Sequence, residues 1–250
     1  MTIYGAIPRG GYRQMPKQNP RSLGFERYAL GFNPALLQYV DCGTDASLQA
    51  TNDTTVEAFI KPVNVTGIFT IAAKSNIVAE DRYSFYVENG ELKCLKECQN
   101  TGIVVIVGGP VAVNTCYHVV FLMGSKGFKL YQNQVEVASN PSTLVLSAGV
   151  HKPLTIGRDY NNVNYFHGLI PLLRIYKDYA LSQEEVRWNR LNYHNPVRPD
   201  KLALWLPMEE GTGLTVVDHS GLGNNGTLLP AATPPTWEQV RQYELRAETE

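Results

Sequence analysis

The sequence has almost no excess of charge of either sign. Its 250 residues contain 22 Lys and Arg against 23 Asp and Glu, a formal net charge of −1 at pH 7. Proteins that bind nucleic acids by bulk electrostatics need a strongly basic domain or face. We therefore expect no nucleic-acid partner, and any charged ligand has to be bound by a local site.

Long hydrophobic runs are also missing. The longest apolar stretch, Ile103 to Val113, is interrupted by Gly108, Gly109 and Pro110, and a membrane-spanning helix needs about 20 apolar residues. The opening residues, MTIYGAIPRGGYRQMPKQNP, lack the apolar core and small-residue cleavage site of a secretory signal. We expect no membrane insertion, and a location outside the cell or on a virion surface, reached after removal of a leader or by another route.

Cysteine is scarce. Cys42, Cys94, Cys98 and Cys116 are too few and too scattered for a disulfide scaffold. The Cys94 and Cys98 pair has no second pair or flanking His at zinc-finger spacing. We expect buried or free thiols and no zinc site.

Short alternating segments and turn signals are abundant. Thr55 to Ile60 alternates, and so do Arg82 to Val87 and Glu91 to Leu95, which flank Asn89-Gly90. Asn-Gly between alternating runs predicts a hairpin, because both turn residues must adopt positive φ. A second hairpin is expected around Gly124 to Gly127. Strands that recur at a spacing of roughly 8–12 residues predict an all-β, two-sheet antiparallel β-sandwich or a barrel.

One short helix is predicted near residues 183–194. Ser182 and Glu185 have the spacing of a capping box, in which each side chain bonds the other's backbone N–H. The helix should end by Asn195, because Pro196 and Pro199 disfavour its continuation.

Three regions are expected along the chain. Residues 1–25 carry Arg9, Arg13, Lys17 and Arg21 and no acidic residue before Phe25; this extended basic arm is either a disordered tail or a segment that orders against a neighbouring subunit. Residues 26–230 form the main domain. Residues 231–250 form a C-terminal tail, with a short, weak helix expected from Trp237 to Leu245.

Several segments occur in the order that a known family shows. They include Tyr28 to Phe32, Gln38 to Gly43, Thr55 to Pro62, Lys129 to Asn133, Leu154 to Gly157, Arg174 to Tyr176 and Ala180 to Glu185. This series, over about residues 28 to 228, resembles laminin G-like domains of the concanavalin A-like lectin and glucanase type. The resemblance implies a jelly-roll sandwich.

The order departs from the family at one place. Leu204 to Gly213 and Val217 to Leu228 look like the segment that normally precedes the strand of the Tyr28 type, yet here they come last. We interpret this as a circular permutation within one chain; the alternative is a tail that completes a neighbouring copy by strand exchange.

The loop after Val217 offers hard oxygen ligands. The resemblance implies that calcium is bound beside an Asp-x-Ser-Gly loop, and it suggests Asp218 and Asn225 as ligands. Pro171 stands where the family usually places a further Asp, so one anionic ligand is lost. The alternative is an Asx-turn in which Asp218 accepts hydrogen bonds from amides near Ser220.

Catalytic patterns are not found. Glycoside hydrolysis needs two carboxylates that face one cleft, and the glucanase strand E-x-D-x-E does not occur; Glu184-Glu185 and Glu209-Glu210 are adjacent pairs. Gly221 to Gly226 matches G-x-G-x-x-G, but the prolines that follow cannot open the helix that a dinucleotide site requires. The sequence therefore predicts no enzyme activity.

The most ligand-like segment runs from Gly157 to Phe166. Sugars stack their C–H faces on exposed aromatic rings and bind their hydroxyls through amide and carboxylate groups. The alternative is a polar loop whose aromatic residues pack on the sandwich edge. The predicted carbohydrate-binding residues are Asp159, Tyr160, Asn161, Asn162, Asn164 and Tyr165.

Two functions compete at this point. The first is a non-catalytic, lectin-like carbohydrate-binding domain displayed on a surface or particle, with a glycan or host surface as its partner. The second is a structural or assembly protein of a phage or virus particle, a decoration or fibre subunit with no ligand of its own. In either case self-association or a particle lattice is expected through Met1 to Gly24 and the C-terminal tail.

Overall fold

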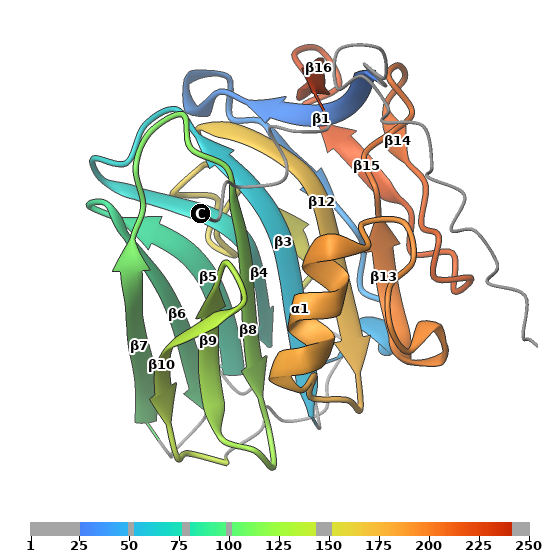
Figure 1. Ribbon diagram of the computed structural model, residues 1–250. Helices are drawn as coiled ribbons and strands as arrows, with labels where there is room; N and C mark the ends of the chain where they lie inside the picture. The colour runs from blue at the N-terminus through green and yellow to red at the C-terminus, as the bar shows by residue number, and fades with distance from the viewer. Residues whose placement is uncertain (1–25, 50–52, 77–80, 99–101, 144–151, 242–250) are drawn as a thin grey trace, which may run out of the picture.

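Two antiparallel sheets face one another in a computed structural model of the chain, and one helix, α1, lies on the outside of the first sheet (Figure 1). The structure describes residues 26–49, 53–76, 81–98, 102–143 and 152–241. Every strand pairing in these ranges is antiparallel. The predicted two-sheet antiparallel β-sandwich of the concanavalin A-like jelly-roll type is confirmed.

The first sheet, sheet A, is the one whose outer face is covered by the helix. Its order is β10-β9-β8-β3-β12-β1-β16, and β13 also pairs with β12. The strands are β1 (Glu26–Phe32), β3 (Thr54–Pro62), β8 (Tyr117–Met123), β9 (Phe128–Gln132), β10 (Val135–Asn140), β12 (Gly168–Lys177), β13 (Leu202–Leu206) and β16 (Thr236–Arg241).

The second sheet, sheet B, has the order β14-β15-β2-β11-β4-β5-β6-β7. Its strands are β2 (Tyr39–Asp41), β4 (Ile68–Asn76), β5 (Asp81–Glu88), β6 (Glu91–Cys98), β7 (Gly102–Pro110), β11 (Thr155–Ile156), β14 (Thr215–Val216) and β15 (Gly226–Leu229). Short 3₁₀ turns lie at Pro34–Leu36, Ala46–Leu48 and Pro199–Lys201.

Both predicted hairpins are present. Asn89 (φ 49°) and Gly90 (φ 79°) take the left-handed conformation that a tight turn demands and join β5 to β6. Gly124 and Gly127 also have positive φ, between β8 and β9. The turn chemistry of the sequence was therefore a reliable guide to these strand pairs.

The core lies between the two sheets. Phe121 is central, since its ring makes edge contacts with Phe85 from sheet B and Phe128 from sheet A. Such edge-to-face contacts add about 0.5–1.5 kcal/mol to the burial of the rings. Cys42, Cys94 and Cys116 are buried free thiols, as expected.

The C-terminal part of the described chain returns to the same body (Figure 1). β13 pairs with β12, and Leu228 of β15 lies opposite Val40 of β2. The segment over 202–228 is thus part of its own sandwich, as the interpretation of a permuted chain requires.

The expected terminal helix is wrong where the structure describes it. Residues 236–241 form strand β16, which pairs with β1 and extends the sandwich beyond the expected limit at residue 230. Trp237 and Val240 are three residues apart, a spacing that suits a helix face. In the strand they point to opposite faces of sheet A, Trp237 toward the core between the sheets and Val240 toward a cluster on the other side. The remaining residues of the expected helix, 242–245, lie outside the described ranges.

Helix α1 (Gln183–Leu191) covers the outer face of sheet A, as Figure 1 shows. The predicted capping box is present: the Glu185 backbone N–H donates to the Ser182 hydroxyl, and the Ser182 N–H donates to the Glu185 carboxylate. The helix ends at Leu191, slightly before the expected limit at 194, with Asn192 as its C-cap. Val186 is its buried apolar contact with the sheet.

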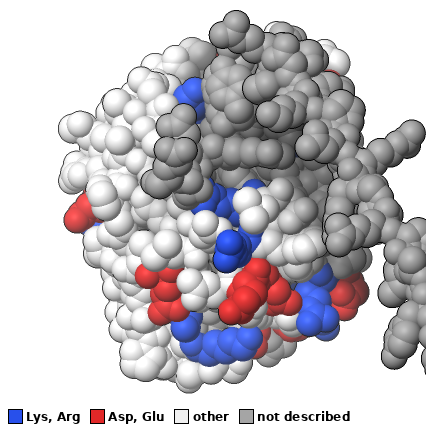
Figure 2. All heavy atoms as spheres, in the orientation of Figure 1, with Lys and Arg blue, Asp and Glu red and all other residues white. Residues whose placement is uncertain are grey.

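Acidic and basic side chains lie next to one another on the face that carries α1, and much of that face is uncharged (Figure 2). Among the described helices, none has the length and apolar composition of a membrane span.

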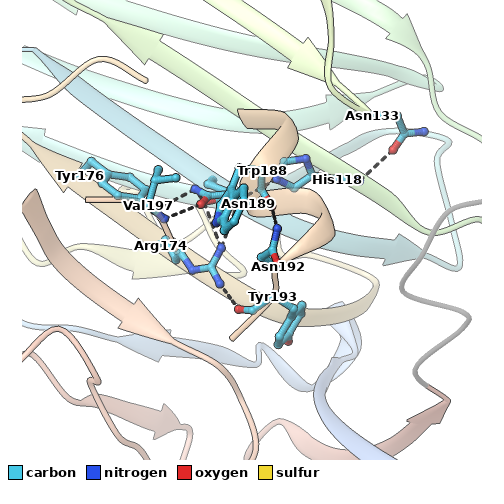
Figure 3. A network of polar contacts seen from close by, with 10 residues as sticks. His118, Asn133, Arg174, Tyr176, Trp188, Asn189, Asn192, Tyr193 and Val197 are labelled. Carbon is cyan, nitrogen blue, oxygen red and sulfur yellow. Dashed lines mark hydrogen bonds and ion pairs between the residues drawn. The ribbon is translucent and has the colours of Figure 1, made fainter. Parts of the chain in front are cut away.

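A buried ionic network holds α1 to the sheet (Figure 3). The carboxylate of Glu57 on β3 accepts hydrogen bonds from Arg174 on β12 (3.3 and 3.4 Å) and from Asn189 of the helix (2.9 Å). It also lies 2.7 Å from His118 Nε2 on β8. The Glu57, Arg174 and His118 side chains are fully buried.

The charge on Glu57 is maintained despite its burial. Burial alone raises the pKa of a carboxyl group, but the Arg174 charge and the His118 hydrogen bond outweigh it and hold the pKa of Glu57 below its usual value. A buried ion pair of this kind contributes little net stability, whereas the loss of one partner is costly. We expect the network mainly to fix the position of α1, since Asn189 joins it from the helix.

Replacing Glu57 with Gln should therefore destabilise the fold strongly. The substitution retains the shape of the side chain but leaves the Arg174 charge buried without compensation, so we expect a loss of about 3–5 kcal/mol. Urea unfolding followed by tryptophan fluorescence measures it. Glu184→Gln at the exposed start of α1 is the control and should cost less than about 1 kcal/mol; equal effects of the two variants would contradict the account.

Candidate sugar-binding face

The predicted ligand loop is closed and anchored to sheet B. It begins at Gly157, whose φ of +83° and contact with the Phe32 ring leave no room for a larger residue. Gly157 accepts a hydrogen bond from the Phe166 N–H (2.8 Å), and the Thr70 N–H of β4 donates to Asn164 O (2.8 Å). These bonds make the loop a fixed part of the sheet surface.

The predicted site residues divide into two groups. Asp159 and Asn164 shape the loop: Asp159 Oδ1 accepts the Tyr160 N–H, and Asn164 Nδ2 donates to Asp159 Oδ2 at 3.5 Å. Asn161 and Asn162 are exposed, and the side chains of Tyr160 and Tyr165 are half-buried. All six lie in one short loop, in which Asn161 and Asn162 are exposed and the other four are half-buried.

The loop lies beside the outer face of sheet B, the face turned away from the core. Phe85 and Val87 of β5 are buried in the core, so Tyr86 between them points outward. Burial and the neighbouring Glu88 raise the pKa of Tyr86, and Asp159 adds a smaller effect of the same sign. Asp159 is therefore within electrostatic range of Tyr86, a residue that the sequence did not single out.

Arg158 and Tyr39 form a second contact on this face. Val40 is buried in the core, so its neighbours Tyr39 and Asp41 point outward. The Arg158 guanidinium lies over the Tyr39 ring, 3.5 Å from the ring centroid. Neither residue was among the predicted ligand-binding residues. Arg158 directly precedes Asp159 in the predicted loop, but Tyr39 is more than a hundred residues away in the sequence, and no local pattern joins the two.

A groove continues from this contact. It has a volume of about 520 Å³ and is lined by residues 41–45 and 222–225 together with Thr227 and Leu229. Leu229 is opposite Tyr39 in the β15 and β2 pairing, and Thr227 is opposite Asp41. The groove and the Arg158 contact therefore share strand β2. We call the loop over 157–166, Tyr39, Tyr86 and the groove together the binding face.

The proposed calcium ligands are already used as hydrogen-bond acceptors. Asp218 Oδ1 accepts from the Trp205 and Ser220 N–H groups, and Oδ2 accepts from the Asn224 N–H and the Ser220 hydroxyl, all within 2.9 Å. Asn225 Oδ1 accepts from the Asp218 N–H at 2.8 Å. This is the Asx-turn alternative, and a calcium ion does not fit these two side chains as they stand.

Within the described ranges, no group of three or more His, Cys, Asp or Glu side chains is placed to hold a metal ion. Pro171, which stands where the family has a carboxylate, instead accepts a hydrogen bond from the Tyr193 hydroxyl through its carbonyl (2.5 Å). Calcium at Asp218 and Asn225 stays a prediction that the geometry does not favour.

The glycine-rich sequence around Gly221 and Gly223 forms a turn. Both residues have positive φ, and the strand β15 follows them. A dinucleotide fingerprint needs a helix at that place, so this segment shapes the groove wall and offers no helix N-terminus to a phosphate.

A known family model matches the sequence that forms this sandwich. The laminin G-type model for the concanavalin A-like lectin/glucanases superfamily matches residues 37–187, more than half of the chain. The chain belongs to this superfamily. The resemblance drawn from the sequence is therefore confirmed, and the match spans β2 to α1, including the loop over 157–166. No curated relative matches significantly.

Solved structures share the fold. A Bacteroides ovatus protein assigned to carbohydrate binding matches with a TM-score of 0.63 at 18% identity; the match covers 81% of this chain and 58% of that one, so this domain spans little more than half its length. A heptameric pentraxin from Limulus polyphemus matches with a TM-score of 0.51 at 18% identity, over 70% of this chain and 84% of that one. The NanB sialidase of Streptococcus pneumoniae has a TM-score of 0.52 at 18% identity, with 65% and 27% covered.

Calcium removal tests the Asp218 turn. We expect a chelator to leave the melting temperature unchanged, since a ligand that binds only the native state must raise it. Asp218→Asn should cost about 2–3 kcal/mol with or without calcium, because the amide nitrogen cannot accept the hydrogen bonds of the carboxylate. Asp200→Asn, at an exposed position, is the control. A fall in melting temperature on chelation that Asp218→Asn abolishes would show that calcium binds there.

Proposed function

We propose that this domain binds carbohydrate, without catalysis, on the binding face of sheet B. The observation that carries the proposal is the continuity of that face: a closed loop with two half-buried tyrosines, an arginine stacked on a third, and a polar groove all lie along β2, β15 and β4. Sugars are recognised by such a combination of aromatic surface and fixed polar groups.

The face also has the rigidity that sugar recognition needs. Asn162 and Asn164 take left-handed backbone conformations, and the loop is closed at Gly157 and Phe166 by a backbone hydrogen bond. A binding surface that is already ordered loses little conformational entropy when a ligand binds. The loop connects β11 to β12, and its fixed conformation supports an additional role in recognition.

The acidic residues support a non-catalytic role. Hydrogen bonds from the Ser47 backbone N–H and, to a smaller extent, from the Ser47 hydroxyl lower the pKa of Asp45 in the groove. A general acid in glycoside hydrolysis needs a raised pKa. Glu57 is enclosed under α1. Burial raises the pKa of Glu209, but its carboxylate contacts Arg27 and His194, while Glu210 accepts the Val217 N–H, so this adjacent pair serves different partners.

The comparisons support the proposal through fold alone. The Bacteroides ovatus protein is assigned to carbohydrate binding and shares the sandwich of this chain at 18% identity. At such identity the ligand does not transfer by analogy. The assignment of a glycan partner here therefore depends on the side chains of the binding face.

A glycan array tests the proposal. We expect binding that falls about tenfold or more, equivalent to about 1.4 kcal/mol, when Tyr160 or Tyr165 is replaced with Ala. Trp188→Ala is the control, because Trp188 is an aromatic residue with 48% exposure on α1, at the opposite sheet. Unchanged melting temperatures would exclude misfolding. Binding that survives both tyrosine variants, or no binding to any glycan, would contradict the proposal.

The assembly role stays a prediction. Self-association was expected through Met1 to Gly24 and the C-terminal tail over 231–250. Residues 1–24 and 242–250 lie outside the described ranges, while residues 236–241 form β16, which pairs with β1 of the same chain. Surface display and a place on a virion are likewise expectations from the sequence. Loss of a regular oligomer on deletion of residues 1–24, measured by light scattering, would support the assembly role.

A further inference from the structure

We propose that the ligand of the binding face is an acidic sugar, an oligosaccharide with one carboxylate on an otherwise neutral chain, and that Arg158 binds this carboxylate. The inference rests on the proposed function and narrows it to a substrate class. It starts from the environment of the Arg158 side chain.

Arg158 differs from Arg27, Arg174 and Arg198 of the sandwich in having no anionic partner. Arg27, Arg174 and Arg198 pair with Glu209, Glu57 and Glu185. Across the described residues, the Arg158 side chain makes no ion pair or hydrogen bond, and its Nε is enclosed without a partner. A half-buried cation in this state is poised to gain from an anion that reaches it.

The orientation of the guanidinium is already fixed. The guanidinium carbon lies over the Tyr39 ring, 3.5 Å from the ring centroid. Stacking of this kind leaves the N–H groups at the edge of the plane able to donate, and their fork matches a carboxylate with two parallel hydrogen bonds. Because Nε is enclosed, a ligand would meet the two terminal nitrogens.

The surroundings select one carboxylate and disfavour a polyanion. The groove beside Tyr39 contains Asp41 and Asp45. Their carboxylates each accept one backbone N–H, from Gly43 and Ser47. A carboxylate oxygen has capacity for further donors, so these groups suit sugar hydroxyls, whereas they repel sulfates or phosphates along a chain.

Polar side chains on the other wall complete the set for neutral sugar units. Thr227 and Asn225 line the groove and are exposed. The Leu229 side chain points to the same outer face and offers apolar surface for sugar C–H groups. An acidic unit at Arg158 would thus place the neutral units that follow it over the groove.

Isothermal titration with paired probes tests the inference. The pairs are 3′-sialyllactose with lactose, and a glucuronic acid-terminated xylo-oligosaccharide with the neutral xylo-oligosaccharide; heparin is the polyanion. We expect at least one acidic probe to bind about tenfold or more tightly than its neutral partner, and heparin to bind no more tightly than that probe. Arg158→Gln should remove this preference. A tenfold difference in affinity is of the size that hydrogen bonds between charged groups contribute.

Two further variants make the result specific. Arg158→Lys keeps the positive charge but cannot donate two parallel hydrogen bonds, so it should retain only part of the preference for the acidic probe. If Arg158→Gln does not fold, the Arg158→Lys variant is used to test the role of Arg158. Arg187→Gln removes one positive charge at an exposed position of α1 and should change nothing.

The outcomes separate this inference from the proposed function. Binding of neutral probes alone, or an acidic preference that persists in Arg158→Gln, would overturn the role of Arg158 and leave carbohydrate binding intact. Tightest binding to heparin would overturn the single-carboxylate class. If none of the probes and no glycan of the array binds, both proposals fail.

Discussion

The pairing of β15 with β2 is the constraint on which the binding face depends. β2 has only three residues, and it is held in sheet B by β11 on one side and β15 on the other. Two short ladders thus place Tyr39 and Asp41 beside Thr227 and Leu229. Together with the hydrogen bond from Asn224 Nδ2 to Ser47 Oγ, they set the position of residues 222–225 against residues 41–45 and so form the groove.

The same pairing explains why the late segment of the chain matters. β15 and β13 come from one short stretch but enter different sheets, since β13 pairs with β12 in sheet A. The Asp218 turn lies between them and accepts the N–H of Trp205 from β13 and the N–H of Asn224 before β15. Asp218 therefore ties the two sheets at one edge by hydrogen bonds alone, which is a structural use of a residue type that also suits calcium.

Arg158 on the outer face of sheet B stands apart from the paired cations of both outer faces. On sheet A, the cations Arg174 and Arg198 are matched by Glu57 and Glu185, and α1 covers the face. On sheet B, Lys93 is likewise paired with Glu88 and Glu91, whereas Arg158 lies over the Tyr39 ring without an acidic partner. A paired charge stabilises or positions the fold, whereas an unpaired and oriented one is available for recognition. This contrast is the physical basis for placing the ligand on sheet B.

The sequence alone determined the features that arise from neighbours in the chain. The Asn89-Gly90 turn, the Ser182 capping box, the alternation of the strands and the ligand-like loop with Asp159, Tyr160 and Tyr165 are all local, because turn and cap geometry depend on a few consecutive residues. Only the tertiary structure decided what lies beside that loop. Tyr39 meets Arg158, and Thr227 meets Asp41, through strand pairings across more than a hundred residues, and β16 forms a strand because β1 offers it an edge. Such pairings depend on the closing of the whole sandwich, so no local pattern encodes them.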